Sequence, residues 1–272
     1  MIGATSLGFV ADSYFAPIEQ TDTSGRYLAG PATSGPWAAH LQHGGPPNAL
    51  AVAAAERALR AETGRDDFVA LRLAADFVRP VPVDEIETQA RVVRAARSAA
   101  LVHVVVTAQG RVCLETRVWF VRRWDTSSIA AAPTQSPSRP EDESPLEFEF
   151  GYGASLEWHF VSGRMSVPGP AAAWVRPTLP LIAGHEYSGL SRVALIADSA
   201  SGISAELDWS AWSFLNVDLD IHLARPFTGE WLLMEAATQL GADGSALARS
   251  TLSDERGIVG SGLQTLVLAI SS

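Results

Sequence analysis

The stretch Asn216–Pro226 reads NVDLDIHLARP, and it decides how the rest of the chain is interpreted. Apolar residues alternate along it with two aspartates and a histidine. A period of two is typical of a strand with one buried face. Pro226 has no N–H to donate to a neighbouring strand, so the pairing should stop or reach an edge there. The pattern predicts a half-buried strand over Asn216–Ala224.

A second stretch, Leu71–Pro80, ends in the same way and reads LRLAADFVRP. The arginines before the two prolines are 146 residues apart (225 − 79). The same offset continues for about forty residues without a gap, and it places Val112 on Ile258 and Phe120 on Leu266. Self-similarity at a fixed offset indicates an internal duplication. The chain therefore consists of two half-chains with one layout.

Composition and length indicate a globular chain. The 272 residues are 47% hydrophobic and 18% charged, so each half can bury its own core. A net charge of −10 argues against a nucleic-acid partner, which requires a basic surface. Cys113 is alone, so an internal disulfide and a cysteine-based metal site are excluded. Neither a signal peptide nor an apolar run of membrane-spanning length is evident, and we expect a cytoplasmic protein.

Periodicity and turn signals place the secondary structure. An Ala-rich helix should run over about Asn48–Ala61, after a Gly-Gly-Pro-Pro break, and a second over Ser191–Ala200, capped by Ser188 or Ser191. A Ser-, Pro- and acid-rich linker separates the halves. The predicted strands are 9–16, 26–28, 69–77, 86–95, 100–108, 112–121, 146–150, 157–164, 171–176, 216–224, 231–240, 246–252 and 258–268.

This order of elements predicts an α+β fold in which each half wraps an antiparallel sheet round its helix. We place the first domain at residues 1–124, the linker at 125–145 and the second domain at 146–272.

Four motifs support a family resemblance. They are HGGPPNALAVAAAERAL at 43–59, ALIADSA at 194–200, GEWLL at 229–233 and GSGLQ at 260–264. In this order, together with the duplicated Arg-Pro strands, they resemble the double-hotdog acyl-CoA thioesterases of the medium-chain bacterial and peroxisomal type. The resemblance implies two tandem hotdog repeats and hydrolysis of an acyl-CoA or acyl-carrier thioester to the free acid. It implies no metal and no prosthetic group, and it is compatible with a homo-oligomer.

Asp198 is the sharpest candidate for chemistry. Apart from Ser199, its neighbours in Val193–Ala200 are apolar or small. A carboxylate in such surroundings is costly unless it is paired, hydrogen-bonded or in a cleft. It can deprotonate a water molecule, or it can simply cap a turn through backbone amides. The resemblance favours the first reading, because the family's catalytic aspartate lies at this position.

Two amides complete the candidate catalytic set. Gln264 is the polar residue of an otherwise apolar final strand, where it either holds a water molecule or faces solvent. Asn216 lies nine residues before Arg225, where the family often has Thr or Ser. The resemblance implies a catalytic set of Asp198, Asn216 and Gln264. The amide in place of a hydroxyl leaves open whether the rate is preserved.

His43, Gly44 and Gly45 precede the first helix and are the candidate substrate-binding residues. Glycines let a ligand approach the backbone, and a helix N-terminus offers free amides to a developing oxyanion. An ordinary turn and a structural histidine are the alternatives. Arg79 and Arg225 either bind the phosphates of coenzyme A or brace the sheet through a carboxylate such as Asp76.

Other reaction classes lack their signatures. The sequence has no GxSxG element, no nucleotide-binding glycine pattern and no metal-ligand spacing of histidines. Hotdog hydratases pair an aspartate with a histidine nearby in sequence, and no histidine follows Asp198 closely, so hydration of enoyl thioesters is less favoured. A module that binds acyl thioesters without hydrolysis remains the main alternative. Trp37, Trp174 and Trp231 are expected in the core or in pocket walls.

Overall fold

A computed structural model describes residues 12–132 and 135–271. The helices and strands of the first half are β1 (Phe15–Gln20), β2 (Ser24–Ala29), η1 (Pro31–Thr33), α1 (Gly45–Thr63), β3 (Phe68–Phe77), β4 (Glu85–Ala95), β5 (Ala99–Ala108) and β6 (Arg111–Arg122). A short turn of helix, η2 (Ser127–Ile129), lies in the segment between the halves. The second half contains α2 (Gly151–Ala154), β7 (Leu156–Arg164), β8 (Val167–Pro177), α3 (Gly189–Ala197), α4 (Ala200–Ile203), β9 (Trp212–Asn216), β10 (Asp218–Leu223), β11 (Leu232–Leu240), β12 (Ser245–Asp254) and β13 (Gly257–Ile270).

All strands join one antiparallel sheet with the order β1-β2-β4-β5-β6-β3-β10-β13-β12-β11-β8-β7, and β9 also pairs with β13. Outward from the central pair, the strands of the two halves follow each other in the same sequence order. The predicted duplication is therefore present in the topology. The halves meet at β3 and β10, where Ala74 pairs with Asp220, the residue 146 positions later. An approximate two-fold axis thus passes between these two residues.

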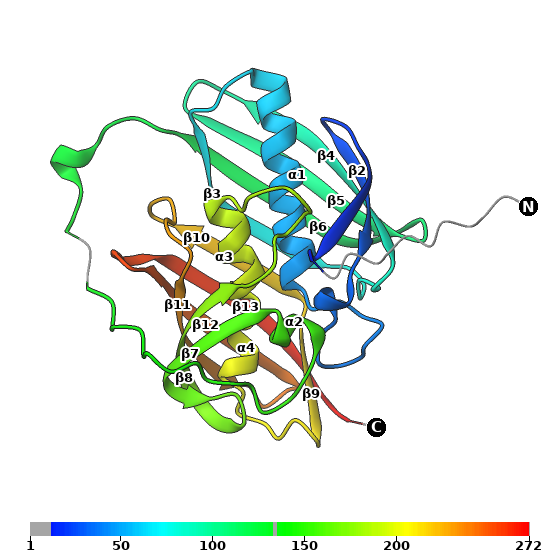
Figure 1. Ribbon diagram of the computed structural model, residues 1–272, viewed down its shortest axis with the longest axis vertical. Coiled ribbons are helices and arrows are strands. Elements are labelled where there is room, and N and C mark those ends of the chain that lie inside the picture. The colour runs from blue at the N-terminus through cyan, green and yellow to red at the C-terminus, as the bar shows by residue number, and fades with distance from the viewer. Residues whose placement is uncertain (1–11, 133–134, 272) are drawn as a thin grey trace, which may run out of the picture.

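The helices α1 and α3 lie side by side against one face of the sheet (Figure 1). Ala-rich faces allow this close packing, and Ala51, Ala54 and Ala55 of α1 are fully buried. The helix α1 begins with Gly45 and two prolines, whose missing N–H groups cost nothing in a first turn. It ends at Gly64, which has a left-handed φ of 62°. The predicted α+β plan of antiparallel strands wrapped round Ala-rich helices is confirmed, and the strands of the two halves are continuous in one sheet.

The decisive strand differs from its prediction in one respect. Residues 216–224 are divided between the end of β9 and β10, and Val217 lies between them with 42% exposure. In the first half, β3 has a bulge between Ala70 and Arg72, which is the equivalent place. Both halves therefore have an irregular strand at this position. Leu219, Ile221 and Leu223 are buried, as the alternation predicts.

Three other predicted elements need correction. The segment Leu146–Phe150 is not a strand, and α2 follows it instead. The second helix divides into α3 and α4, because the chain turns at Asp198 and Ser199. The first strand begins at Phe15, and the start of the predicted range 9–16 lies outside the described residues.

The segment between the halves leaves the sheet after β6 and returns across the second repeat (Figure 1). On its return it is held by hydrogen bonds from Trp174 Nε1 to the carbonyl oxygen of Pro137 and from Ser144 N to that of Trp158. The domain limits of 1–124 and 146–272 stay a prediction.

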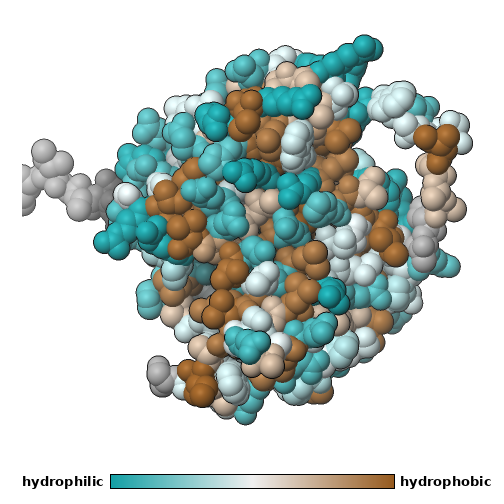
Figure 2. Space-filling view, turned by 180° about the vertical axis from the view of Figure 1, so that it is seen from behind, coloured by the Kyte–Doolittle hydropathy of each residue, from teal (hydrophilic) through white to brown (hydrophobic). Residues whose placement is uncertain are grey.

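The far side of the molecule carries mixed hydrophobic and hydrophilic patches (Figure 2). Within the described part of the chain, no helix combines the length and apolarity that a membrane crossing requires.

Candidate active site

Asp198 lies at the C-terminal end of α3, where the helix stops and α4 begins one turn later. The start of α3 is fixed by Ser188, whose hydroxyl accepts a hydrogen bond from Ser191 N at 3.2 Å. The position of the helix in turn sets the position of Asp198 at its end. The whole residue is 4% exposed. Such a buried carboxylate requires hydrogen-bond donors, and the structure provides them from three directions.

Two of the donors are the amides that were selected from the sequence. Asn216 Nδ2 donates to Asp198 Oδ1 at 2.8 Å, and Gln264 Nε2 donates to the same oxygen at 3.2 Å. Gln264 Nε2 also donates to the backbone carbonyl of Asp198 at 3.0 Å, while its Oε1 accepts from Ser201 N at 3.1 Å. Both ends of the Gln264 amide are therefore engaged. The structure brings all three residues together from the C-terminal end of α3, from β9 and from β13.

The third donor comes from the other repeat. His43 Nδ1 lies 3.0 Å from Asp198 Oδ2 and 3.2 Å from the amide nitrogen of Gly45. Only one of these contacts can be a hydrogen bond at a time, because Nδ1 either carries the proton or accepts one. Asp198 thus has a histidine partner although none follows it closely in sequence. The spacing along the chain did not predict this pair, because His43 comes from the other repeat.

His43 is itself held by an aromatic ring that the sequence analysis missed. Tyr152 of α2 stacks on the imidazole with ring centroids 3.8 Å apart. The Tyr152 hydroxyl donates to the carbonyl oxygen of Leu195 and lies 2.8 Å from Ser199 Oγ. Burial lowers the pKa of His43, and the nearby Asp198 charge only partly offsets this effect. Burial also raises the pKa of Tyr152 well above its ordinary value. Both rings are therefore neutral near pH 7.

The two glycines are required by the close approach of α1 to α3. A Cβ atom on Gly44 would lie 2.7 Å from Asp198 Oδ2 and would also collide with Phe77. A Cβ atom on Gly45 would overlap the carbonyl oxygen of Leu195. Pro46 and Pro47 have no N–H, so Gly44 and Gly45 supply the amides at this end of α1.

A cavity of about 380 Å³ opens beside this cluster, and Asp198, Asn216, His43 and Gly44 line it. Much of its remaining wall is apolar and aromatic. Trp37 stacks on Trp209 at a centroid distance of 5.1 Å, and Phe214 meets Trp209 edge-on at 4.5 Å. The arrangement places a buried carboxylate next to an apolar space, which suits a reaction of a ligand that has an apolar part.

The remaining predicted residues separate into two groups. Trp37 and Arg79 line the cavity, whereas Trp174 and Trp231 form a separate buried cluster with Ala172 and Leu233. Arg225 braces the sheet, but through Asp254 and not Asp76.

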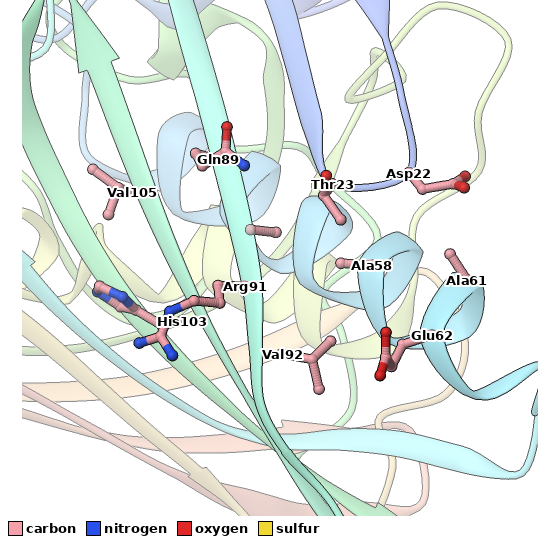
Figure 3. A pocket seen from close by; sticks show the side chains of 11 residues that line it. Asp22, Thr23, Ala58, Ala61, Glu62, Gln89, Arg91, Val92, His103 and Val105 are labelled. Atoms are coloured by element: carbon pink, nitrogen blue, oxygen red, sulfur yellow. The ribbon is translucent and has the colours of Figure 1, made fainter.

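A second hollow of about 600 Å³ lies beside the C-terminal end of α1, and Figure 3 shows its side chains. Ala58, Ala61 and Glu62 come from α1, while Gln89 and Arg91 come from β4. All of its lining residues belong to the first half, and none of them lines the Asp198 cavity. It therefore has no part in the cluster described above.

Comparisons with known proteins agree with the geometry. Residues 33–121 match the family model "Acyl-CoA thioesterase N-terminal domain", and residues 131–268 match "Acyl-CoA thioesterase C-terminal domain". No curated protein matches the chain.

Solved structures share the fold. An acyl-CoA thioesterase II, TesB2, from Mycobacterium marinum is 14% identical, with a TM-score of 0.69, and the alignment covers 94% of this chain and 95% of that one. The tesB protein of Mycobacterium avium subs paratuberculosis is 15% identical, with a TM-score of 0.68 and coverage of 93% and 96%. A hotdog-fold protein of unknown function from Alicyclobacillus acidocaldarius is 13% identical, with a TM-score of 0.75 and coverage of 98% and 100%. The predicted double hotdog is confirmed.

Proposed function

Because this chain belongs to the acyl-CoA thioesterase family, we propose that it hydrolyses acyl-CoA thioesters through a water molecule that Asp198 activates. The observation that carries the proposal is the position of Asp198. Its carboxylate is buried, receives hydrogen bonds from two amides and lines a largely apolar cavity. A carboxylate in this setting can accept a proton from water while the water oxygen attacks a carbonyl carbon.

Gln264 and Asn216 have different parts in this scheme. Gln264 is held at both ends by backbone groups and by Asp198, so it orients the carboxylate. Asn216 uses its Nδ2 for Asp198 and for the carbonyl oxygen of Asp218. Its Oδ1 is left to accept a hydrogen bond from the attacking water. Asn216 thereby serves the purpose for which the family often has a hydroxyl.

The first repeat supplies the groups that receive the developing negative charge. When His43 Nδ1 carries its proton toward Asp198, the Gly45 N–H loses its acceptor there and becomes available. Together with the Gly44 amide at the start of α1, it can donate to the thioester oxygen as that oxygen becomes an oxyanion. Donors fixed by a helix backbone need no reorganisation during the reaction.

The steps balance without a cofactor. Water loses a proton to Asp198, and its oxygen bonds to the thioester carbon. The carbon–sulfur bond then breaks, and the thiolate takes the proton that Asp198 received. The products are the free acid and the thiol. We place the acyl chain against Trp37, Trp209 and Phe214, which form the apolar wall of the cavity.

The direct test is thiol release from octanoyl-CoA, measured with a thiol reagent on the purified protein. Asp198→Asn keeps the shape of the side chain and removes its basicity, and we expect kcat to fall about 10²- to 10⁴-fold. Equal thiol release by wild type and variant would remove Asp198 from the mechanism.

The His43–Asp198 pair also makes enoyl hydration worth testing on the same samples. Loss of the conjugated absorbance of crotonyl-CoA, without thiol release, would assign a hydratase instead. Binding of octanoyl-CoA with neither change would assign a binding module.

A further inference from the structure

The two arginines that end the duplicated strands have different surroundings. Arg225 forms a fork with Asp254, with both nitrogen–oxygen distances at 2.6 Å, and it also donates to the carbonyl oxygen of Gly257 at 2.8 Å. Asp254 is fully buried. Burial alone would raise the pKa of Asp254, but hydrogen bonds from Arg225, Arg256 and Thr228 outweigh it and hold that pKa below its ordinary value. Arg225 is therefore a structural brace.

Arg79 occupies the equivalent position and lacks this partner. The hairpin that carries Asp254 pairs it with Gly257, and the matching hairpin of the first repeat pairs Ala108 with Arg111. Ala108 stands where the carboxylate would be. Arg79 keeps only the backbone contact, from one terminal nitrogen to the carbonyl oxygen of Val112 at 2.8 Å. No carboxylate among the described residues forms an ion pair with it.

The position of Arg79 differs from that of its counterpart in a second way. Arg79 is exposed and lines the Asp198 cavity together with Val78 and Pro80. One guanidinium nitrogen is fixed by a backbone carbonyl, so the group is held at the rim while its remaining N–H groups are free. A chain with a net charge of −10 repels an anionic substrate unless a local cation receives it.

We propose that Arg79 binds a phosphate group of the thioester carrier and so selects phosphorylated thioesters over unphosphorylated ones. This inference rests on the proposed function. A planar guanidinium pairs with phosphate oxygens through two parallel hydrogen bonds. Because Ala108 stands where the other repeat has Asp254, the Arg79 guanidinium is available for this contact. The phosphate belongs either to coenzyme A or to the phosphopantetheine arm of an acyl carrier protein.

The test compares octanoyl-CoA with octanoyl-pantetheine, which presents the same acyl group and thiol without phosphate. In Arg79→Gln, we expect KM for octanoyl-CoA to rise about three- to tenfold, as for loss of a solvent-exposed charged hydrogen bond, with little change in kcat. The preference for octanoyl-CoA over octanoyl-pantetheine should shrink by the same factor. Arg94→Gln, which makes the same charge change at the far end of β4, is the matched control.

A second variant tests the same contact without removing the arginine. Ala108→Asp restores the carboxylate that Asp254 provides in the other repeat, and it should capture Arg79 and reduce the preference for octanoyl-CoA as Arg79→Gln does. Thermal unfolding shows whether the variant is folded. Octanoyl-acyl carrier protein as a further substrate shows which carrier supplies the phosphate. Arg79→Gln should raise KM for the carrier whose phosphate Arg79 binds and leave KM for the other carrier unchanged.

An unchanged preference in a folded Arg79→Gln protein would overturn the inference while leaving the proposed hydrolysis intact. If wild type hydrolyses no thioester, the proposed function fails. Calorimetric titration with free coenzyme A then tests Arg79 alone. Weaker binding by Arg79→Gln supports its phosphate contact, and equal binding contradicts it.

Discussion

His43 Nδ1 lies 3.0 Å from Asp198 Oδ2, and the two residues belong to different repeats of the duplicated chain. The contact forms because α1 and α3 lie side by side, with the N-terminal end of α1 at the C-terminal end of α3. Each repeat thus contributes a part of the proposed site that the other lacks.

His43 offers the first prediction. His43→Ala removes the partner of Asp198 Oδ2 and should lower kcat about 10²-fold or more. His43→Asn places an amide nitrogen near the position of Nδ1, so it should lose only about tenfold. The comparison is made by thiol release from octanoyl-CoA, with His185→Ala on the exposed surface as control. An equal fall in kcat in both His43 variants would show that a nitrogen at the position of Nδ1 does not contribute to the reaction.

Gln264 should affect orientation more than binding. Gln264→Leu removes one of the two hydrogen bonds to Asp198 Oδ1 and leaves Ser201 N–H buried without an acceptor, so we expect a stability loss of about 1–3 kcal/mol. A misplaced carboxylate should lower kcat by up to about 10²-fold, with KM nearly constant. Gln239→Leu is the control, because this substitution makes the same chemical change at an exposed position of a strand. A raised KM with normal kcat would instead mean that Gln264 contacts substrate.

Gly45 should resist substitution for a steric reason. Its Cβ would overlap the carbonyl oxygen of Leu195, and backbone atoms cannot move aside cheaply. Gly45→Ala should therefore destabilise the fold by about 1–3 kcal/mol, measured by chemical denaturation. Gly202→Ala is the matched control, since its Cβ would lie 3.7 Å from the nearest atom of Trp209. The explanation fails if the two variants unfold at the same denaturant concentration.

Glu56 on α1 should make stability depend on pH. Burial raises its pKa from 4.5 to about 7, although Ser188 and Arg60 oppose the shift. A carboxyl group whose pKa is higher in the folded than in the unfolded protein contributes its full stabilisation of the fold at pH values below the unfolded pKa. This contribution is lost as pH rises through the window from 4.5 to about 7. Glu56→Gln should therefore be more stable than wild type by about 2 kcal/mol at pH 8, a figure reduced for partial exposure, and equal at pH 4. Denaturation at both pH values measures this difference, and a gain that is the same at both would exclude titration as the cause.

The sequence predicted the elements that depend on local pattern. Strict alternation and turn signals placed β3, β4, β5 and β6 to within a residue at each end. The Arg-Pro offset located the duplication, and equivalent register pairs confirm it: Asn216 pairs with Leu266 as Ala70 pairs with Phe120. The prediction from alternation was wrong at Leu146–Phe150, where the alternating apolar residues have no neighbouring strand with which to pair.

The candidate site was predictable only in part. Asp198 and Gln264 stand out because each is polar in apolar surroundings. Tyr152 gives no such signal, since an isolated tyrosine is common in a core. The pairing of His43 with Asp198 depends on how two helices pack, and 155 residues separate them in sequence (198 − 43). The different fates of Arg79 and Arg225 depend on one residue in a distant hairpin.

Equivalent positions of the two repeats show what duplication has permitted. Ala70 and Val118 stand in the first repeat where Asn216 and Gln264 stand in the second, and both are buried and apolar. The first repeat therefore carries no second copy of the proposed Asn216–Gln264 pair, although the symmetry of the fold provides the positions for one. Either half alone would lack part of the proposed site, since His43 comes from one half and Asp198 from the other.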